Sequence, residues 1–348
     1  MSLPKRLVLL GTGTVGGAFT ERHARLRAAG VAVPAIRAIA NARGWREVDA
    51  DGDAAPCLRD LRAAAAPRDG QWLATARFGR GDVVVDASAS DVLASRHADW
   101  LAAGADVVTA CKLGQGTALS RWRAIRQAAA DGGGGYGDSA TVGAGLPLIR
   151  SIRELRAGGD RIHAIAGVLS GSLAWLFNHY DGMRPFSGFV REARDAGYTE
   201  PDPRDDLSGE DVRRKIVILA RAAGVELEAD AVRVASLVPE ALASLPLARL
   251  DAALPVLDEP LRQRYAKAYR NDEVLKFIAR YAHGEASVGL EALPRAHPLA
   301  AGGGTDNRVA IWSDRYRAQP LVIQGPGAGA EVTAAALLDD VLRLTLSG

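Results

Sequence analysis

The feature that most constrains the fold is a short apolar run that leads directly into a glycine-rich turn. Leu7–Leu10 contains no polar residue, as expected of a parallel strand buried on both faces, and Gly-Thr-Gly-Thr-Val-Gly follows it before a helical stretch. In this spacing the first glycine permits a tight turn, the second lets a pyrophosphate approach the backbone, and the third lets helix and strand pack closely. The helix N-terminus then offers free N–H groups to the phosphates. The predicted dinucleotide-binding residues of this turn are Gly11, Gly13, Thr14, Val15 and Gly16.

Further along the chain, short apolar runs alternate with helical stretches. Strand patterns cover residues 33–40, 82–86 and 106–109, and a helical pattern covers residues 91–103. Such alternation is typical of βαβ units in a doubly wound, mostly parallel sheet. We therefore expect an α/β fold with a Rossmann-type dinucleotide-binding domain over residues 1–140.

A run of four glycines, Gly132–Gly135, is the main break in composition and by itself predicts a flexible loop. Beyond it the alternation becomes irregular, and we expect a second, α+β domain for substrate binding and dimerisation over residues 141–324. A strand-like run at 321–324 and a glycine-rich turn precede a last helical pattern over 331–346. We expect residues 325–348 to rejoin the first domain.

The end of the second predicted strand bears on which dinucleotide is bound. NAD is usually held at this point by a carboxylate that binds the ribose hydroxyls, but this chain reads Ala40-Asn-Ala-Arg43. Arg43 is suited to a 2′-phosphate, although a solvated surface arginine is an equally good interpretation. The sequence favours NADP and leaves NAD open.

The densest group of charged residues lies in an acidic loop that begins at Gly197. Glu200, Asp205 and Asp206 gather there beside two prolines, which restrict the loop. Carboxylates held in this way suit a substrate that carries its own ammonium group. A solvated acidic loop with no function is the alternative.

The clearest helical pattern in the chain follows this loop, over residues 208–223, with Ser208 as its expected cap. Asp211 and Lys215 are four residues apart and therefore share one face of this helix. The pattern places an ammonium beside a carboxylate at the acidic loop. An exposed ion pair of small energetic value is the competing interpretation.

The composition argues against several other classes of function. The net charge is +2 and the basic residues are scattered, so nothing favours a nucleic-acid or membrane partner. No apolar run approaches the length of about 20 residues that spans a bilayer. Cys57 and Cys111 form no disulfide framework, and the six histidines have no metal-binding spacing, so we expect these histidines to be structural or at the surface. With no leader sequence before the first strand, we expect a cytoplasmic protein.

The stretch Gly197–Lys215 closely resembles the signature of the homoserine dehydrogenase family. Other motifs of that family follow in order over nearly the whole chain. Besides the glycine turn they are Asp86–Ser90, Val107–Lys112, Thr141–Pro147, Gly167–Ser172 and Gly325–Thr333. The Ser-Gly-Ser form of residues 170–172 is most similar to the dehydrogenase half of bifunctional aspartokinase–homoserine dehydrogenases.

The resemblance implies a homodimeric enzyme that interconverts L-aspartate 4-semialdehyde and L-homoserine with NAD(P), in the biosynthesis of threonine, methionine and isoleucine. It assigns proton transfer at the carbinol oxygen to Lys215, with Asp211 beside it. It assigns substrate binding to Glu200, through the ammonium group, and to Asp206. Further residues implied near cofactor or substrate are Lys112, Ser88, Gly327 and Gly329.

The chain departs from the family pattern at two positions. Cys111 replaces the asparagine that usually precedes the lysine at 112, and we expect a small buried residue there rather than a reactive thiol. Ser139 replaces an acid that, in relatives, helps to hold a monovalent cation, and Asp138 lies one residue earlier. The remaining candidate ligands for sodium or potassium are the backbone carbonyls of Val142, Ala144 and Leu146.

Two other functions remain open from the sequence. An aspartate-semialdehyde dehydrogenase needs a cysteine nucleophile, for which only Cys111 is a candidate, and no histidine partner is evident. A non-catalytic regulator that senses NAD(P) would keep the glycine turn without turnover. The set of Glu200, Asp211 and Lys215 argues against the regulator.

Overall fold

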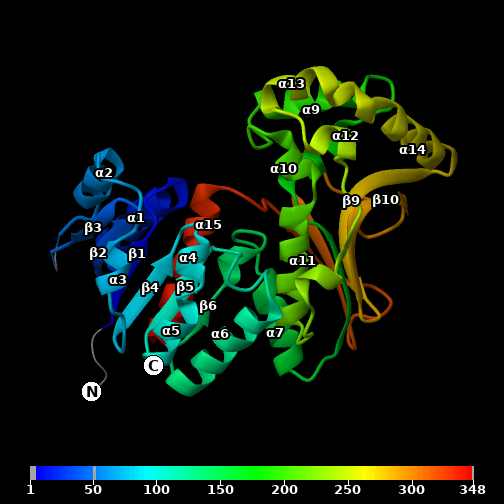
Figure 1. The fold of residues 1–348 in the computed structure, drawn as a ribbon. Helices are drawn as coiled ribbons and strands as arrows, with labels where there is room; N and C mark the ends of the chain where they lie inside the picture. The colour runs from blue at the N-terminus through cyan, green and yellow to red at the C-terminus, as the bar shows by residue number, and fades with distance from the viewer. Residues whose placement is uncertain (1–4, 50–51, 347–348) are drawn as a thin grey trace. The chain divides into compact units, whose positions relative to one another are not determined.

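The computed structural model describes residues 5–49 and 52–346. The N-terminal residues on which the expectation of no leader rests, 1–4, lie outside the described residues. The chain divides into two compact units, with boundaries at Gly145/Leu146 and Gly327/Ala328 (Figure 1). No helix in the described part of the chain is long and apolar enough to cross a membrane.

The first unit is built on a six-stranded sheet with the strand order β3-β2-β1-β4-β5-β6, in which only β3 runs antiparallel to its neighbour. Its strands are β1 (Arg6–Leu10), β2 (Ile36–Asn41), β3 (Gly44–Glu47), β4 (Asp82–Asp86), β5 (Asp106–Thr109) and β6 (Tyr136–Gly137). Its helices are α1 (Thr14–Ala28), α2 (Ala55–Ala63), α3 (Trp72–Thr75), α4 (Asp91–Ala94), α5 (His97–Ala102), α6 (Leu119–Gly132), η1 (Ser139–Thr141) and α15 (Ala330–Leu346). The expected α/β, Rossmann-type architecture is confirmed.

The central strands of this sheet are apolar between their end residues because both faces are covered. Alternate side chains of β1 enter two different cores: Leu7 and Leu9 pack with residues of α1, α2 and α15, whereas Val8 and Leu10 pack with residues of α5 and α6. Successive residues of a strand point to opposite faces, so the middle of a strand buried on both faces has no polar position. The polar residues of β4 and β5 lie at the strand ends. The predicted strands 82–86 and 106–109 are confirmed with these bounds.

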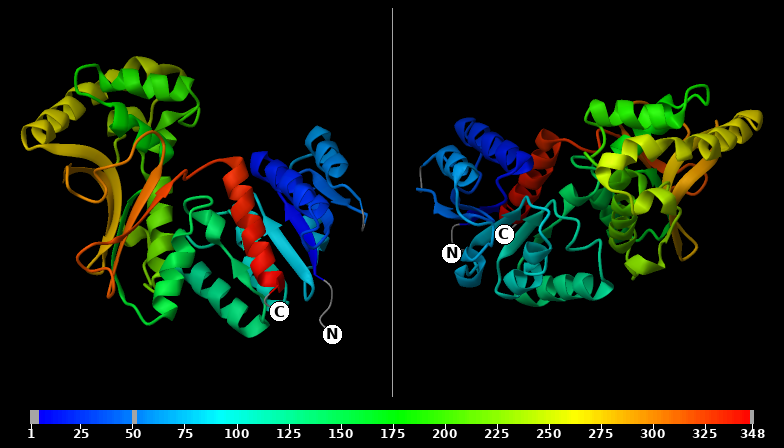
Figure 2. Two further views of the ribbon diagram at one scale, coloured as in Figure 1. Left: turned by 180° about the vertical axis from the view of Figure 1, so that it is seen from behind. Right: turned by 45° about the horizontal axis from the view of Figure 1, so that its top comes forward.

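The last helix, α15, lies beside α1 in the first unit (Figure 2). Leu337, Leu338 and Val341 are buried in the same core as Leu7 and Phe19. The segment that ends the described chain therefore completes a core begun by the first strand.

The glycine run Gly132–Gly135 ends α6 and forms a short connection. These residues connect α6 to β6 within the first unit. A Cβ at Gly132 would lie 2.1 Å from the Leu101 carbonyl oxygen, and one at Gly134 would lie 2.1 Å from that of Ala105. The glycines are required because the backbones pack too closely for side chains.

The second unit holds another six-stranded sheet, with the order β12-β11-β7-β9-β10-β8. Its strands are β7 (Ile162–Val168), β8 (Arg233–Val234), β9 (Glu273–Ala282), β10 (Glu285–Pro294), β11 (Asn307–Ser313) and β12 (Leu321–Gly325). Its helices are α7 (Leu148–Ala157), α8 (Gly171–His179), α9 (Phe186–Asp195), α10 (Pro203–Leu207), α11 (Glu210–Ala222), η2 (Ala229–Ala231), α12 (Glu240–Ala243), α13 (Leu247–Ala253), η3 (Leu254–Leu257) and α14 (Asp258–Arg270). All its strands pair antiparallel except β8 with β10.

The helix predicted over residues 208–223 begins later than expected. Gly209 has φ +78°, and this left-handed residue separates α10 from α11, which starts at Glu210. Ser208 ends α10 instead of capping α11, although its hydroxyl accepts the Glu210 backbone N–H at 3.2 Å. A side chain at 209 would also lie 3.0 Å from the Phe277 ring. The chain therefore changes direction at Gly209, between α10, which carries Asp205 and Asp206, and the first turn of α11.

Candidate active site

The glycine turn after β1 has the shape needed to hold a pyrophosphate. A Cβ at Gly16 would lie 2.0 Å from the Gly11 carbonyl oxygen, so helix and strand meet too closely for any side chain. Gly11 has φ +112°, which favours glycine. A Cβ at Gly13, in contrast, would have nothing within 4 Å, although its φ of −72° suits any residue. Gly13 is therefore the position where the absent side chain leaves room for a ligand, as a dinucleotide requires.

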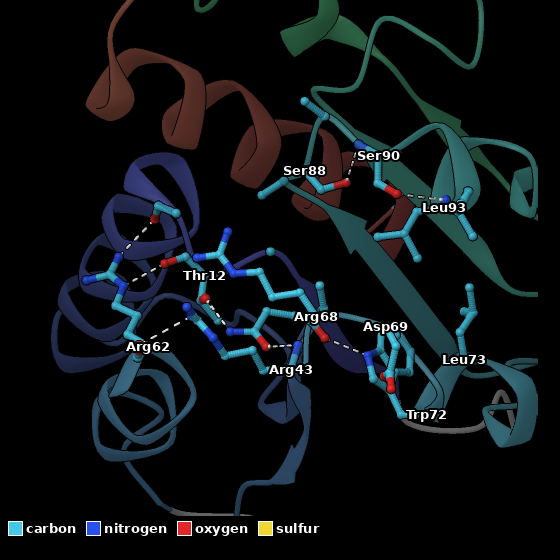
Figure 3. Close-up of a pocket in the computed structure, with 18 residues that line it drawn as sticks. Thr12, Arg43, Arg62, Arg68, Asp69, Trp72, Leu73, Ser88, Ser90 and Leu93 are labelled. Carbon is cyan, nitrogen blue, oxygen red and sulfur yellow. Dashed lines mark hydrogen bonds between the residues drawn. The ribbon is translucent and has the colours of Figure 1, made fainter. Parts of the chain in front are cut away.

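A cavity of about 730 Å³ opens beside this turn (Figure 3). It is lined by the turns that follow β1, β2 and β4, which are parallel strands ending at one edge of the sheet. Ligands of open α/β sheets bind at this edge, and the first turn of α1, with Thr14 and Val15, presents unpaired N–H groups there. The cavity therefore lies where a dinucleotide is expected.

Arg43 lines this cavity from the tight turn between β2 and β3. Its backbone N–H donates to the Asn41 side chain at 2.7 Å, and the Asn41 amide donates to the Thr12 hydroxyl at 2.9 Å. Asn41 thus occupies the place of the usual carboxylate and links the β2 turn to the glycine turn. Asp69 is an acidic residue of the same cavity wall, and its carboxylate accepts the Gln71 N–H at 3.1 Å.

Two further arginines in the cavity wall were missed by the sequence analysis. Arg62, from α2, donates to the Thr12 carbonyl at 2.6 Å and to the Gly13 carbonyl at 2.9 Å, so its guanidinium lies across the glycine turn (Figure 3). Arg68 lines the same cavity. Nothing in the sequence distinguishes them from the other scattered arginines, because only the fold brings them to Arg43.

An aromatic side chain also contributes to the cavity wall. The Trp72 indole N–H donates to the Asn41 carbonyl at 2.6 Å, which ties α3 to the end of β2. Trp45 packs against the same ring at a centroid separation of 5.7 Å. The remaining surface of Trp72 lines the cavity and offers an apolar contact next to the arginines.

The segment after β5 holds Cys111 and Lys112. Cys111 is buried, and this burial raises the pKa of its thiol to about 12. A thiol in this state is not a nucleophile at neutral pH, which removes the chemical basis for a thioacyl mechanism at this residue. The Lys112 carbonyl accepts the Gly116 N–H at 2.7 Å, so the lysine begins a tight turn.

In the second unit, Lys215 is a buried lysine with an exposed fraction of 9%. Its Nζ lies 2.8 Å from the Asp211 carboxylate and donates to the Leu169 carbonyl at 2.7 Å. Leu169 directly follows β7, so strand and helix hold the ammonium from two sides. The interpretation of this pair as an exposed ion pair is wrong for the lysine, because only Asp211 is substantially solvent-exposed.

Asp206 organises the acidic loop around this lysine's helix. It accepts the Ser172 hydroxyl at 2.6 Å and the Glu200 backbone N–H at 2.8 Å. Burial raises the pKa of Asp206, and the two hydrogen bonds oppose that shift. Glu200 and Asp205 are both exposed.

Gly327, at the end of the second unit, packs against a polar side chain that the sequence analysis missed. A Cβ at Gly327 would lie 2.0 Å from the Asn307 side chain, and the Asn307 amide lies 3.5 Å from the Leu169 carbonyl that holds Lys215. Gly329 belongs to the first unit, where its carbonyl accepts the Thr333 N–H and hydroxyl as α15 begins.

The candidate cation loop contains two successive left-handed residues, Gly143 at φ +76° and Ala144 at φ +51°. Asp138 is buried, and the hydroxyl of Ser139 donates to Asp340 at 2.9 Å. Ser139 therefore supplies a neutral hydroxyl, held by Asp340, where the family has a carboxylate. Within the described ranges no group of three or more His, Cys, Asp or Glu side chains is arranged to hold a metal.

The parallel sheet, the glycine turn and the held lysine together define the class of dinucleotide-binding α/β oxidoreductases. The family model "Homoserine dehydrogenase, NAD binding domain" matches residues 11–136, and the model "Homoserine dehydrogenase" matches residues 147–342. The chain belongs to the homoserine dehydrogenase family.

Individual relatives agree with this placement. A homoserine dehydrogenase of Emericella nidulans is 35% identical over 99% of both chains. The chloroplastic bifunctional aspartokinase/homoserine dehydrogenase 2 of Zea mays is 44% identical over 75% of this chain, which spans only 29% of that protein. A crystal structure of a Candida auris protein of unknown function has a TM-score of 0.85 and 32% identity, over 99% of this chain and 98% of that one.

Proposed function

We propose that this protein is a homoserine dehydrogenase that interconverts L-aspartate 4-semialdehyde and L-homoserine, with NADP preferred to NAD. The observation that carries the proposal is the buried Lys215, held by Asp211 and by the Leu169 carbonyl. Family membership supports the substrate, and the reaction is a step of threonine, methionine and isoleucine biosynthesis.

Lys215 acts as the proton donor and acceptor at the substrate oxygen. An ammonium has three N–H donors, and Asp211 and Leu169 occupy two of them. The third is left for the oxygen that is a carbonyl in the aldehyde and a hydroxyl in the alcohol. In the reducing direction a protonated lysine delivers its proton as the oxygen gains negative charge, a role that general acids fill in such reactions.

The cofactor, when bound, supplies or accepts the hydride at the substrate carbon. The first unit holds it: Gly11, Gly13 and Gly16 admit the pyrophosphate, and Trp72 is placed to contact the adenine. In the second unit, Glu200 and Asp206 bind the substrate through its ammonium group. We propose that Lys112 also contributes to the site, and that residues 146–327 form the substrate-binding and dimerisation domain.

The preference for NADP is proposed from three cationic side chains at the end of β2. Arg43, Arg62 and Arg68 all line the cavity beside the glycine turn. Guanidinium groups bind phosphate through paired hydrogen bonds, and a 2′-phosphate distinguishes NADP from NAD at this place. Asn41 stands where a carboxylate usually selects ribose hydroxyls, and its side chain is engaged by Thr12. Asp69 also lines the cavity, where its carboxylate accepts the Gln71 N–H at 3.1 Å.

Replacing Arg43 with alanine tests this preference. We expect the Kd for NADP to rise about tenfold or more, the usual scale for losing a hydrogen bond to a charged group, with almost no change for NAD. Arg46→Ala is the matched control, because Arg46 lies on β3 outside the cavity and donates to the Trp45 carbonyl. Titration by fluorescence or calorimetry gives both constants. Equal losses for both cofactors would contradict the assignment.

We further propose a cytoplasmic homodimer and a weak monovalent-cation site of sodium or potassium at the carbonyls of Val142, Ala144 and Leu146. Family resemblance supports both. Light scattering at micromolar concentration should give twice the chain mass of 36.5 kDa. A monomeric mass would remove the dimer from the proposal.

The activity itself is tested by one spectrophotometric assay. Homoserine oxidation is followed by the absorbance of the reduced nicotinamide that it forms, with NAD and NADP in parallel. We expect turnover with both and a higher kcat/KM with NADP. No turnover of homoserine by a folded protein that binds the cofactor would favour a dinucleotide-sensing role instead.

A further inference from the structure

A buried chain of hydrogen bonds runs behind the wall of the cofactor cavity. Asp86, the last residue of β4, and His97, the first of α5, both have fully buried side chains. The His97 Nε2 lies 3.0 Å from one Asp86 oxygen, and the His97 Nδ1 lies 3.0 Å from the Tyr136 hydroxyl. The other Asp86 oxygen accepts the Ser88 hydroxyl at 2.6 Å and the Ser88 backbone N–H at 3.0 Å. Ser88 lines the cavity (Figure 3).

Donor and acceptor chemistry assigns a direction to these hydrogen bonds when the His97 ring is taken as neutral. Burial raises the pKa of the Tyr136 phenol well above its usual value, so this group keeps its proton and donates it to the His97 Nδ1. The Nδ1 is then an acceptor, and the proton of the neutral ring is on Nε2. The Nε2–H donates to Asp86, because a carboxylate only accepts.

The same ordering determines what Ser88 can offer to a ligand. A hydroxyl has one proton, and Asp86 receives that of Ser88 over a short distance of 2.6 Å. One acceptor site of the Ser88 oxygen takes the Ser90 N–H at 3.2 Å. What remains towards the cavity is a second acceptor site. Ser88 therefore suits a ligand group that donates, such as a ribose hydroxyl or a carboxamide N–H, and does not suit a phosphate.

The His97 ring is tightly enclosed by neighbouring backbone. A Cβ at Gly114 would lie 2.9 Å from the Tyr136 hydroxyl and 3.2 Å from the His97 Nδ1. The turn that follows Lys112 thus packs directly on the histidine. Asp86 and Thr109 add a weaker contact at 3.5 Å, which joins the ends of β4 and β5. One buried ring therefore contacts the segments that follow both strands.

We propose that His97 is a positioning residue for cofactor binding, which acts through Asp86 to make Ser88 a hydrogen-bond acceptor for a donor group of the dinucleotide. This inference rests on the proposed function only in taking the cavity as the cofactor site. The proposal gives His97 a role in the affinity for the cofactor, although its sequence spacing indicates neither metal binding nor catalysis.

A double-mutant cycle with NADPH as the ligand tests the proposal. Binding is followed by the fluorescence of NADPH, which does not depend on homoserine turnover. We expect His97→Leu to raise the Kd about tenfold, Ser88→Ala to raise it about tenfold, and the double variant to match Ser88→Ala. His97→Gln places an amide donor near the position of Nε2 and should stay within about threefold of the unmodified protein. Additive losses in the double variant would show that His97 does not act through Ser88.

Two controls separate positioning from general stability. His23 is also buried in the first unit, where its Nε2 lies 2.8 Å from the Pro34 carbonyl, so His23→Leu loses a comparable contact away from the cavity. It should lower the melting temperature without changing the Kd. If His97→Leu does not fold, Tyr136→Phe makes the same test. We expect Tyr136→Phe to raise the Kd for NADPH in the protein that has Ser88, and to leave the Kd unchanged in the Ser88→Ala variant. An equal Kd change in His23→Leu and His97→Leu would overturn the proposal.

The two halves of the cofactor locate the group that Ser88 accepts. We expect Ser88→Ala to weaken either 2′,5′-ADP or reduced nicotinamide mononucleotide, and to leave the other half unchanged. Unchanged binding of both halves would contradict the acceptor role. If the unmodified protein binds no NADPH at all, the proposed function fails, and that result is distinct from every outcome of the cycle.

Discussion

Replacing Lys215 with alanine should lower kcat by about 100-fold or more in both directions, the usual scale for removing a general acid–base group. The reason is geometric: Asp211 and the Leu169 carbonyl hold the ammonium at fixed distances of 2.8 and 2.7 Å, and no other lysine lies on α11. The Kd for NADP should barely change, since the glycine turn belongs to the other unit. Stopped-flow or steady-state assays of homoserine oxidation and aldehyde reduction measure both rates.

The matched control is a second ion pair on the same helix. Arg213 lies 2.6 Å from Glu210, and Arg213→Ala removes this pair without touching Lys215. Arg213 is partly buried and also donates to the Ala229 carbonyl at 3.1 Å, so Arg213→Ala should lower the melting temperature, while turnover by the folded protein should remain near normal. A folded Lys215→Ala protein with near-normal kcat in both directions would end the assignment.

Gly13→Val should raise the Kd for either dinucleotide about 100-fold or more while the protein stays folded. The unliganded protein has space for the new side chain, because nothing lies within 4 Å of a Cβ at this position and the backbone angles suit any residue. A pyrophosphate must approach the backbone through that space. A valine side chain there therefore blocks phosphate binding but does not disturb the fold. Calorimetric titration and a thermal melt measure the two effects.

The controls for this variant are other glycines. Gly188 on α9 is equally open, and Gly188→Val should leave the Kd unchanged. Gly16→Val is unsuitable, because its side chain would overlap the Gly11 carbonyl and damage the turn itself. A Gly13→Val protein that binds NADP normally would show that the dinucleotide does not use this turn.

The sequence was most informative where burial and backbone chemistry agree. The strands at 82–86 and 106–109 were predicted with the observed bounds, because a strand covered on both faces shows as a run of valines between polar end residues. The hairpin of β9 and β10 was not predicted. Its two-residue turn, His283–Gly284, has φ +53° and +81°, and glycine supplies only one of the two signals that such turns usually carry.

The site could be predicted only where its residues are neighbours in sequence. Asp211 and Lys215 are one helical turn apart, so their spacing was enough to place them together. Arg62, Trp72 and His97 reach the cavity or its wall through separate helices, and their spacing carries no periodic signal. Arginine is also common in this chain, which hides the few that line a cavity.

The position of α15 has a consequence for how the chain folds. The hydrophobic core of the first unit is completed by α15, whose residues lie more than 300 positions after β1 in the sequence. The contacts between α15 and α1 include an ion pair between Arg25 and Glu331 at 3.0 Å. During synthesis, Leu7 and Phe19 emerge early and have no complete core until α15 has left the ribosome. The second unit, residues 146–327, is one continuous segment, so its core can form without waiting for α15. Contacts of this sequence separation slow folding and keep apolar surface exposed for longer, so the nascent first unit is the part of this chain most in need of a chaperone.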